Sequence, residues 1–205
     1  MNNVYRLYLV TDDTLDLTTL KHVVREAVKG GVTLVQVREK HGNVRAFIER
    51  AQAIKDILQG TGVPLIINDR VDVALAVNAD GVHLGQSDMP VTIARQLLGA
   101  DKILGLSIET QAQLTQAQTM PLDYIALSAI FPTQTKTNTT MYWGVEGLQK
   151  TVSMTSLPVV AIGGINEHNI SELCATGVDG LALVSAICSA DDPQAVSRYF
   201  IELMN

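Results

Sequence analysis

The stretch TLVQVREKHGNVRAFIERAQAIKDILQGTGVPLIIND, residues 33–69, contains one complete strand–helix–strand unit. Its two ends, 33–38 and 64–68, are short runs rich in β-branched residues, and residues 44–58 between them have helical spacing. Gly60 and Gly62 end that helix. Two strands joined through a helix run parallel to each other with a right-handed crossover, so this stretch predicts a parallel α/β fold.

The same unit recurs along the whole chain of 205 residues, as eight strand-like runs that alternate with eight helical segments. Eight such units in about 200 residues fit a closed (β/α)8 barrel better than an open sheet. No glycine-rich dinucleotide fingerprint follows the first strand, and no interdomain linker is visible. We therefore expect residues 1–205 to form a single (β/α)8 barrel domain. The expected strands are 5–10, 33–38, 64–68, 81–84, 103–107, 124–127, 158–162 and 180–184, and the expected helices are 17–30, 44–58, 71–77, 91–98, 109–118, 145–152, 166–176 and 193–204.

The composition excludes several classes of protein. Apolar residues make up 47% of the chain, which is too many for a disordered protein. The formal charge of −6 argues against a general binder of nucleic acid or anionic membranes, which needs a basic excess. The chain has no apolar run long enough to span a membrane and no secretory signal, and Cys174 and Cys188 have neither CxxC nor zinc spacing. We expect a cytoplasmic protein that binds small molecules, and the sequence leaves its oligomeric state open.

The second strand carries charge where a barrel strand is ordinarily apolar. Gln36, Arg38 and Lys40 alternate and therefore share one face, whereas Val37 and Glu39 point away from it. Active sites of such barrels lie at the carboxyl ends of the strands. Two cations held together there need an anion, and an arginine beside a lysine suits a phosphate or diphosphate. The alternative is a solvated strand end with ordinary surface charge.

Two acids follow the next two strands, Asp69 after the third and Asp88 after the fourth. Side chains at neighbouring strand ends can share a ligand, and Mg²⁺ is commonly held by one or two carboxylates together with substrate phosphates. The alternative is that each acid caps the helix that follows it. His83, between apolar neighbours, is expected to be an ordinary buried residue outside the chemistry. Ser107 ends the fifth strand with no His-and-acid partners for a nucleophilic triad, which indicates a hydrogen-bonding role.

A second anion site is predicted at the seventh and eighth strands. Gly163-Gly164 leads into a helix, and Val184-Ser185 ends the eighth strand, where this fold often binds phosphate. The loop 128–142 contributes hydroxyls and a lysine. The alternatives are a tight Gly-Gly turn and a threonine-rich surface loop. Two separate sites indicate two phosphorylated substrates, or one substrate with a phosphate at each end.

The motifs at these strand ends resemble those of the thiamine-phosphate synthase family, from about Leu7 to the last strand. One departure is Ser128-Ala129-Ile130, where the family usually has Gly-Pro-Ile. The matching motifs are QVREK (36–40), NDR (68–70), GVHLGQSD (81–88), IFPTQTK (130–136), WG (143–144), AIGGI (161–165) and VSAI (184–187).

The resemblance implies a (β/α)8 barrel that joins hydroxymethylpyrimidine diphosphate to hydroxyethylthiazole phosphate through a pyrimidine cation, with release of diphosphate. It implies catalytic roles for Arg38, Lys40, Ser107 and Lys136, and Mg²⁺ bound by Asp69 and Asp88. The pyrimidine diphosphate would be bound by Gln36, Val37, Arg38, Glu39, Lys40, Asn68, Ser107 and Lys136. The thiazole phosphate would be bound by Thr133, Gln134, Thr135, Gly163, Gly164, Val184 and Ser185. Two alternatives are a thiazole tautomerase of the same barrel type, which needs no diphosphate clamp, and a non-catalytic binder of thiamine phosphates.

Overall fold

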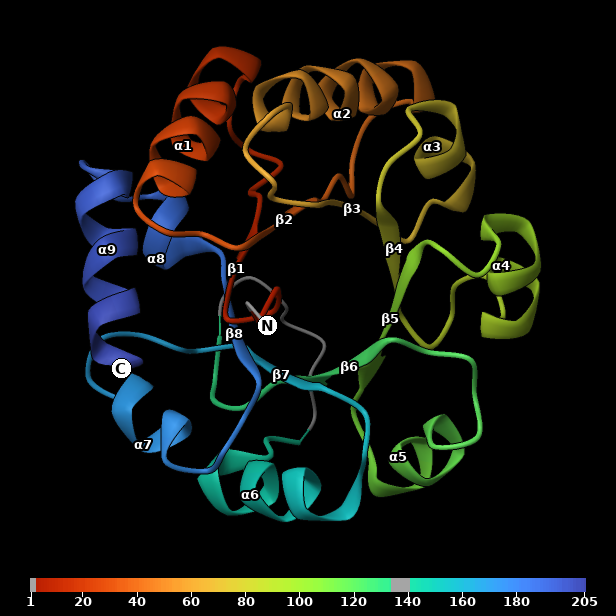
Figure 1. Cartoon of the computed structure of the whole chain (residues 1–205), viewed down its shortest axis with the longest axis vertical. Helices are drawn as coiled ribbons and strands as arrows, with labels where there is room; N and C mark the ends of the chain where they lie inside the picture. Colours follow the sequence, from red (N-terminus) through yellow and green to blue (C-terminus); the bar gives the residue numbers. More distant parts are fainter. Residues whose placement is uncertain (1–2, 134–140) are drawn as a thin grey trace.

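The computed structural model describes residues 3–133 and 141–205. Eight parallel strands pair in sequence order, and β1 pairs with both β2 and β8, so the sheet closes into a barrel (Figure 1). This confirms the expected (β/α)8 fold. The strands are β1 (Leu7–Val10), β2 (Leu34–Val37), β3 (Leu65–Asn68), β4 (Gly81–Leu84), β5 (Ile103–Ile108), β6 (Tyr124–Ser128), β7 (Val159–Ile162) and β8 (Gly180–Leu183).

Within the described residues, nine helices surround the barrel (Figure 1). The prediction of eight was wrong because it missed α8, whose four residues are too few to show a helical period. The expected helix 166–176 is also shorter, since turns occupy its ends. The helices are α1 (Leu17–Lys29), α2 (Val44–Leu58), α3 (Val71–Ala76), α4 (Val91–Leu98), α5 (Gln111–Ala117), α6 (Gly144–Met154), α7 (Ile170–Cys174), α8 (Ser185–Cys188) and α9 (Pro193–Leu203).

Alternation along each strand divides the buried side chains into two clusters. Val35 and Val37 belong to the outer cluster, between the strands and the helices. Leu34 points the other way, into the barrel, as the period of two requires. The inner cluster consists of Tyr8, Val10, Leu34, Ile66, Tyr124, Ala126, Val160 and Ala182.

One glycine makes room for the largest side chain inside the barrel. A Cβ atom on Gly105 of β5 would lie 2.1 Å from Cζ and 2.5 Å from Oη of Tyr124 on neighbouring β6. Small barrels fill their interiors by setting small residues beside large ones. The phenol of Tyr124 therefore crosses the barrel only because position 105 has no side chain.

A repeated hydrogen bond ties together the amino ends of the strands. The pattern concerns β2, β4, β6 and β8. The side chain of the residue just before each of these strands accepts a hydrogen bond from a backbone N–H near the start of the strand that precedes it in sequence. Asp179, before β8, accepts from Val159 of β7 at 2.7 Å. The other three bonds join Thr33 to Leu7 at 3.0 Å, Asp80 to Leu65 at 2.7 Å and Asp123 to Leu104 at 2.8 Å. This end of the barrel is thus held by side chains that serve stability, which leaves the opposite end for ligands.

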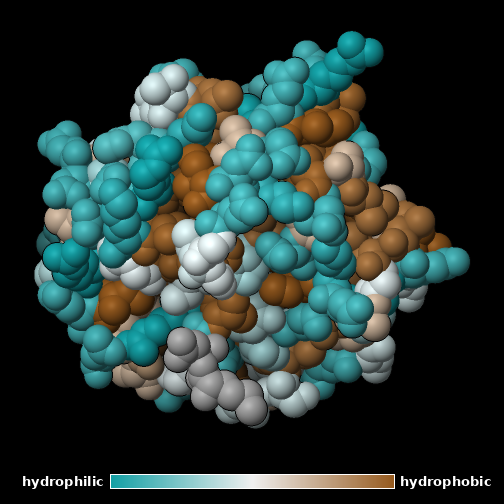
Figure 2. Space-filling view, turned by 45° about the horizontal axis from the view of Figure 1, so that its top comes forward, coloured by the Kyte–Doolittle hydropathy of each residue, from teal (hydrophilic) through white to brown (hydrophobic). Residues whose placement is uncertain are grey.

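On the face seen in Figure 2, hydrophilic side chains are interspersed with apolar ones. Leu75 on α3 and Ile93 and Leu97 on α4 are exposed. In the described part of the chain, none of the helices has the length and apolar character needed to cross a membrane.

We expect Asp179→Ala to lower the free energy of unfolding by about 1–3 kcal/mol, because it leaves the buried amide of Val159 without an acceptor. Asp179→Asn keeps an acceptor oxygen and should lose less. Urea denaturation of the three proteins measures the difference. Equal stability of the alanine variant and the parent would show that this tie does not stabilise the barrel.

Candidate functional site

A cavity of about 750 Å³ opens at the carboxyl ends of the strands, and residues of all eight strands line it. A second hollow of about 710 Å³ adjoins it and shares Arg38, Lys40, Thr133, Gly164 and Ser185 with it. The residues that the sequence placed at strand ends therefore meet around one space, as the fold predicts.

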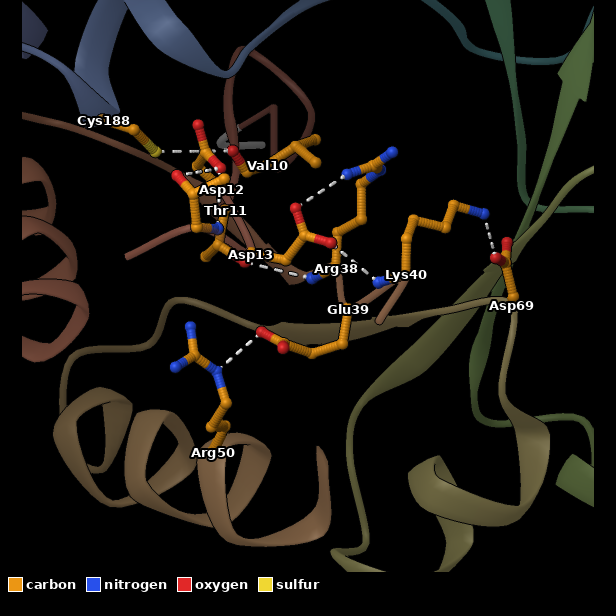
Figure 3. Close-up of polar contacts among 11 residues, drawn as sticks. Val10, Thr11, Asp12, Asp13, Arg38, Glu39, Lys40, Arg50, Asp69 and Cys188 are labelled. Carbon is orange, nitrogen blue, oxygen red and sulfur yellow. Dashed lines mark hydrogen bonds and ion pairs between the residues drawn. The ribbon is translucent and has the colours of Figure 1, made fainter. Parts of the chain in front are cut away.

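Arg38 and Lys40 are held on the wall of this cavity by the loop that follows β1 (Figure 3). The backbone N–H of Arg38 donates to Oγ1 of Thr11 at 3.0 Å, and that of Lys40 donates to Oδ2 of Asp13 at 3.0 Å. The other oxygen of Asp13 lies 3.6 Å from Nη1 of Arg38. Asp13 thus positions both cations. Sequence reasoning missed it, although a carboxylate placed directly after β1 was the available signal.

The two residues between these cations face away from the cavity. Val37 is fully buried in the outer cluster. Glu39 turns towards α2, where its Oε1 accepts from Nε of Arg50 at 2.7 Å (Figure 3). Burial raises the pKa of Glu39 above its ordinary value, and the nearby Arg50 opposes that rise. The expectation that these residues bind the pyrimidine diphosphate is therefore corrected for their side chains. Any contact with a ligand would come from the main chain.

Asp69 and Asp88 lie together at the ends of β3 and β4, and both line the cavity. Asp69 is ion-paired with Lys40 (Figure 3). Burial raises the pKa of Asp69, the Lys40 ammonium lowers it, and a hydrogen bond with Asp88 raises it. Asp88 also accepts the N–H of Gly85 at 2.6 Å. Neither acid caps a helix, since the N-cap residues of α3 and α4 are Arg70 and Pro90 and neither helix has a side-chain cap. The capping alternative is therefore wrong.

These two carboxylates fit a magnesium ion. The described residues contain no cluster of three or more His, Cys, Asp or Glu side chains suited to a metal. Mg²⁺ needs fewer protein ligands, because it usually keeps waters and takes substrate phosphates alongside one or two carboxylates. Two adjacent carboxylates, one with a raised pKa, are also a place where a cation is favoured electrostatically.

Asn68, next to Asp69, holds an unused donor. Its side chain is 7% exposed and lines the cavity, and its Nδ2 has no hydrogen-bond partner in the protein. A buried N–H group without an acceptor costs free energy. An acceptor atom of a ligand in the cavity would remove that cost, so Asn68 marks this wall as a binding surface.

The floor of the cavity is a chain of hydrogen bonds across the barrel. Gln36 Nε2 donates to Tyr8 Oη at 2.6 Å, and Tyr8 Oη lies 2.9 Å from Tyr124 Oη. His83 Nδ1 lies 2.8 Å from Tyr124 Oη, and His83 Nε2 lies 2.9 Å from Ser107 Oγ. His83 is buried as expected, but it also lines the cavity, so leaving it out of the site was wrong. Its hydrogen-bond partners come from two other strands, Ser107 from β5 and Tyr124 from β6, which residue spacing does not reveal.

The opposite wall carries the predicted second anion site. Gly163 and Gly164 have φ of 102° and 69°, and a Cβ atom on Gly164 would lie 2.6 Å from the carbonyl oxygen of Pro132. The pair therefore makes a tight turn that packs against the segment after β6, and it also lines the cavity. Thr133, Val184 and Ser185 line the cavity as well. The predicted residues Gln134, Thr135 and Lys136 lie outside the described residues. The Ser128–Ala129 peptide bond is cis.

Comparison with known proteins gives the family of the chain. A family model described as thiamine monophosphate synthase matches residues 7–187. A thiamine-phosphate synthase from Vibrio campbellii is 73% identical over 202 residues, which cover 98% of this chain and 99% of that protein.

Solved structures give the same family and a broader fold group. A thiamine phosphate pyrophosphorylase from Pyrococcus furiosus matches with a TM-score of 0.89 at 36% identity, over 98% of this chain and 96% of that one. A 3-hexulose-6-phosphate synthase from Salmonella typhimurium matches with a TM-score of 0.74 over 96% of this chain and 97% of that one, but at 16% identity it shares the fold alone. Because the family model and these relatives extend over most of its length, the chain belongs to the thiamine monophosphate synthase family and is a transferase of the thiamine-phosphate synthase type.

Proposed function

We propose that the cavity couples hydroxymethylpyrimidine diphosphate with hydroxyethylthiazole phosphate, with Mg²⁺, to give thiamine phosphate and diphosphate. The observation that carries this proposal is the set of charges on one wall. Arg38 and Lys40 lie beside the paired acids Asp69 and Asp88. Cations and carboxylates interleaved in this way suit a diphosphate that arrives together with a divalent ion.

The existing ion pairs explain why the diphosphate needs that ion. Arg38 is already near Asp13, and Lys40 is already paired with Asp69. A bare diphosphate would compete with these carboxylates and would be repelled by them. Asp69 and Asp88 would hold the cation, whose charge would offset the acids, and Lys40 would then be available to pair with the diphosphate. Mg²⁺ bound there would neutralise charge that develops on the departing diphosphate.

The residues support a dissociative reaction. The bond from the methylene carbon to oxygen breaks, and its electron pair leaves with the diphosphate, which Arg38 and Lys40 stabilise. The thiazole nitrogen then supplies the pair that forms the new C–N bond, so neither an enzymic base nor a nucleophile is required. Apolar side chains of Ala126, Ile162 and Ala182 line the cavity, and they would limit the access of water to a cation formed there.

The other wall is proposed to hold the thiazole phosphate. Gly163-Gly164 exposes backbone in a left-handed conformation, and Ser185 begins α8 directly after β8. Backbone N–H groups at such positions suit phosphate oxygens, and this is a recurrent phosphate site of the fold. Thr133 lies beside them. Gln134 and Thr135 belong to this proposal on the sequence motif alone, and on the same ground Lys136 is proposed to contact the pyrimidine diphosphate.

We also propose a cytoplasmic location. Cys174 and Cys188 are both free thiols, which fits a reducing compartment. Burial raises the pKa of the Cys188 thiol to about 12, which keeps it protonated and unreactive.

The first test mixes both substrates with Mg²⁺ and follows diphosphate release. We expect many turnovers per protein molecule and loss of activity when a chelator removes the metal. A non-catalytic binder would give at most one equivalent of signal. A thiazole tautomerase would act on the thiazole phosphate alone and release no diphosphate, so either result would reject the proposal.

The second prediction concerns Asp69. We expect Asp69→Asn to lower the coupling rate by on the order of 10²-fold, because charge stabilisation at the leaving group is lost. Asp72→Asn is a matched control, since Asp72 lies three residues away and pairs with Arg70 at the surface. It should retain the parent rate. Lys136→Ala is expected to behave like the Asp69 variant. Near-normal rates at saturating Mg²⁺ for both Asp69→Asn and Lys136→Ala would remove these roles.

A further inference from the structure

The chain of hydrogen bonds beneath the cavity has a direction, which is set by the Gln36 amide nitrogen that faces Tyr8, since an amide nitrogen donates and does not accept. The side-chain nitrogen of Gln36 gives a hydrogen to Tyr8 Oη at 2.6 Å. The phenol hydrogen of Tyr8 is then directed to Tyr124 Oη, 2.9 Å away. Tyr124 in turn directs its own hydrogen to His83 Nδ1 at 2.8 Å.

This sequence of bonds decides which tautomer His83 adopts. If Nδ1 accepts from Tyr124, the ring hydrogen of a neutral imidazole is on Nε2. Nε2 then donates to Ser107 Oγ at 2.9 Å. The hydroxyl of Ser107 is left to donate its hydrogen to another group, and the Ser107 side chain lines the cavity.

The reverse direction conflicts with the Gln36 amide as it is oriented, with its nitrogen facing Tyr8. If Ser107 donated to Nε2 of His83, the ring hydrogen would lie on Nδ1 and would be donated to Tyr124 Oη. Tyr124 would then donate to Tyr8, and the hydrogen of Tyr8 would face the amide nitrogen of Gln36, which does not accept. Two donors would oppose each other at a buried site, which costs the free energy of an unmade hydrogen bond.

We infer that Tyr124 is a positioning residue: with Tyr8 and Gln36 it fixes His83 as the Nε2–H tautomer and so turns the Ser107 hydroxyl into a donor for an anionic ligand. The identity of that ligand as a diphosphate rests on the proposed function. The direction of the hydrogen bonds from Gln36 to Ser107 does not.

The residues around these hydrogen bonds favour the same direction. Tyr8 and Tyr124 are 1% and 0% exposed, and Gln36 and His83 are also buried, so water does not compete for these bonds. Burial raises the pKa of both Tyr8 and Tyr124, so both phenols keep the hydrogen that the chain needs. The Tyr124 ring packs against the rings of Tyr5 and His83. Its centroid lies 4.9 Å from the ring centroid of Tyr5 and 5.4 Å from that of His83.

The ligand-binding test uses inorganic diphosphate with Mg²⁺ and calorimetry. We expect Ser107→Ala and Tyr124→Phe each to weaken binding roughly tenfold, the scale of one hydrogen bond to a charged group. Because both changes remove the same donation, the double variant should bind no more weakly than Ser107→Ala alone. Tyr5→Phe is the matched control. Tyr5 packs on Tyr124 but its Oη bonds the carbonyl of Asp123, outside the chain, so binding should not change.

The tautomer itself is read by long-range ¹⁵N–¹H NMR of the parent protein. The chain has four histidines, and the other three, His22, His41 and His168, are exposed. The His83 signals, identified by their absence in His83→Gln, should show Nε2 protonated and Nδ1 unprotonated. A proton on Nδ1 would overturn the inference, as would fully additive losses in the Tyr124–Ser107 pair. If the parent does not bind diphosphate, the proposed ligand is wrong, and the NMR result alone decides the direction of the chain.

Discussion

Closure of the sheet is the constraint on which the site depends. Backbone hydrogen bonds between β1 and β8, with Leu9 opposite Leu183, join the first strand to the last and leave the sheet without an edge. All eight strands are parallel, so all their carboxyl ends meet at one rim. Residues 36 and 185 can therefore line the same cavity although almost the whole chain separates them. The side-chain ties at the amino ends reinforce the same closure without occupying that rim.

At the rim, electrostatics is arranged as pairs of opposite charge. Asp13 and Asp69 lie against Arg38 and Lys40, which keeps these cations in place in the absence of a ligand. Partly buried ion pairs of this kind contribute little net stability, because desolvation offsets much of their attraction. Their value lies in position, and under the proposed function a metal ion would compete with Lys40 for the carboxylate of Asp69.

The sequence predicts the barrel well because its evidence is local and repeated. Strand runs and glycine helix ends recur at each unit, and alternation alone places Gln36 inside and Val37 outside the barrel. The charged site is predictable for the same reason, since Arg38, Asp69 and Asp88 all follow strands. Three features were missed. The helix α8 has four residues, too few to show a helical period. Asp13 acts from the loop after β1 on the backbone N–H of Lys40 and the guanidinium of Arg38, and the role of His83 depends on tyrosines from β1 and β6.

The hydrogen bonds that run from Gln36 through Tyr8, Tyr124 and His83 to Ser107 connect the barrel interior with the cavity. A polar chain across a barrel interior is tolerated only when every member is satisfied, since unmade bonds at low dielectric are costly. Here the bonds continue without a break from Gln36 to Ser107 and end at the cavity. The open positions, the hydroxyl of Ser107 and the amide of Asn68, both face the space that a ligand would fill. Ligand binding therefore completes the hydrogen bonding of the core. For the same reason Gly105 matters to binding although it touches no ligand, because any side chain there would push Tyr124 out of the chain.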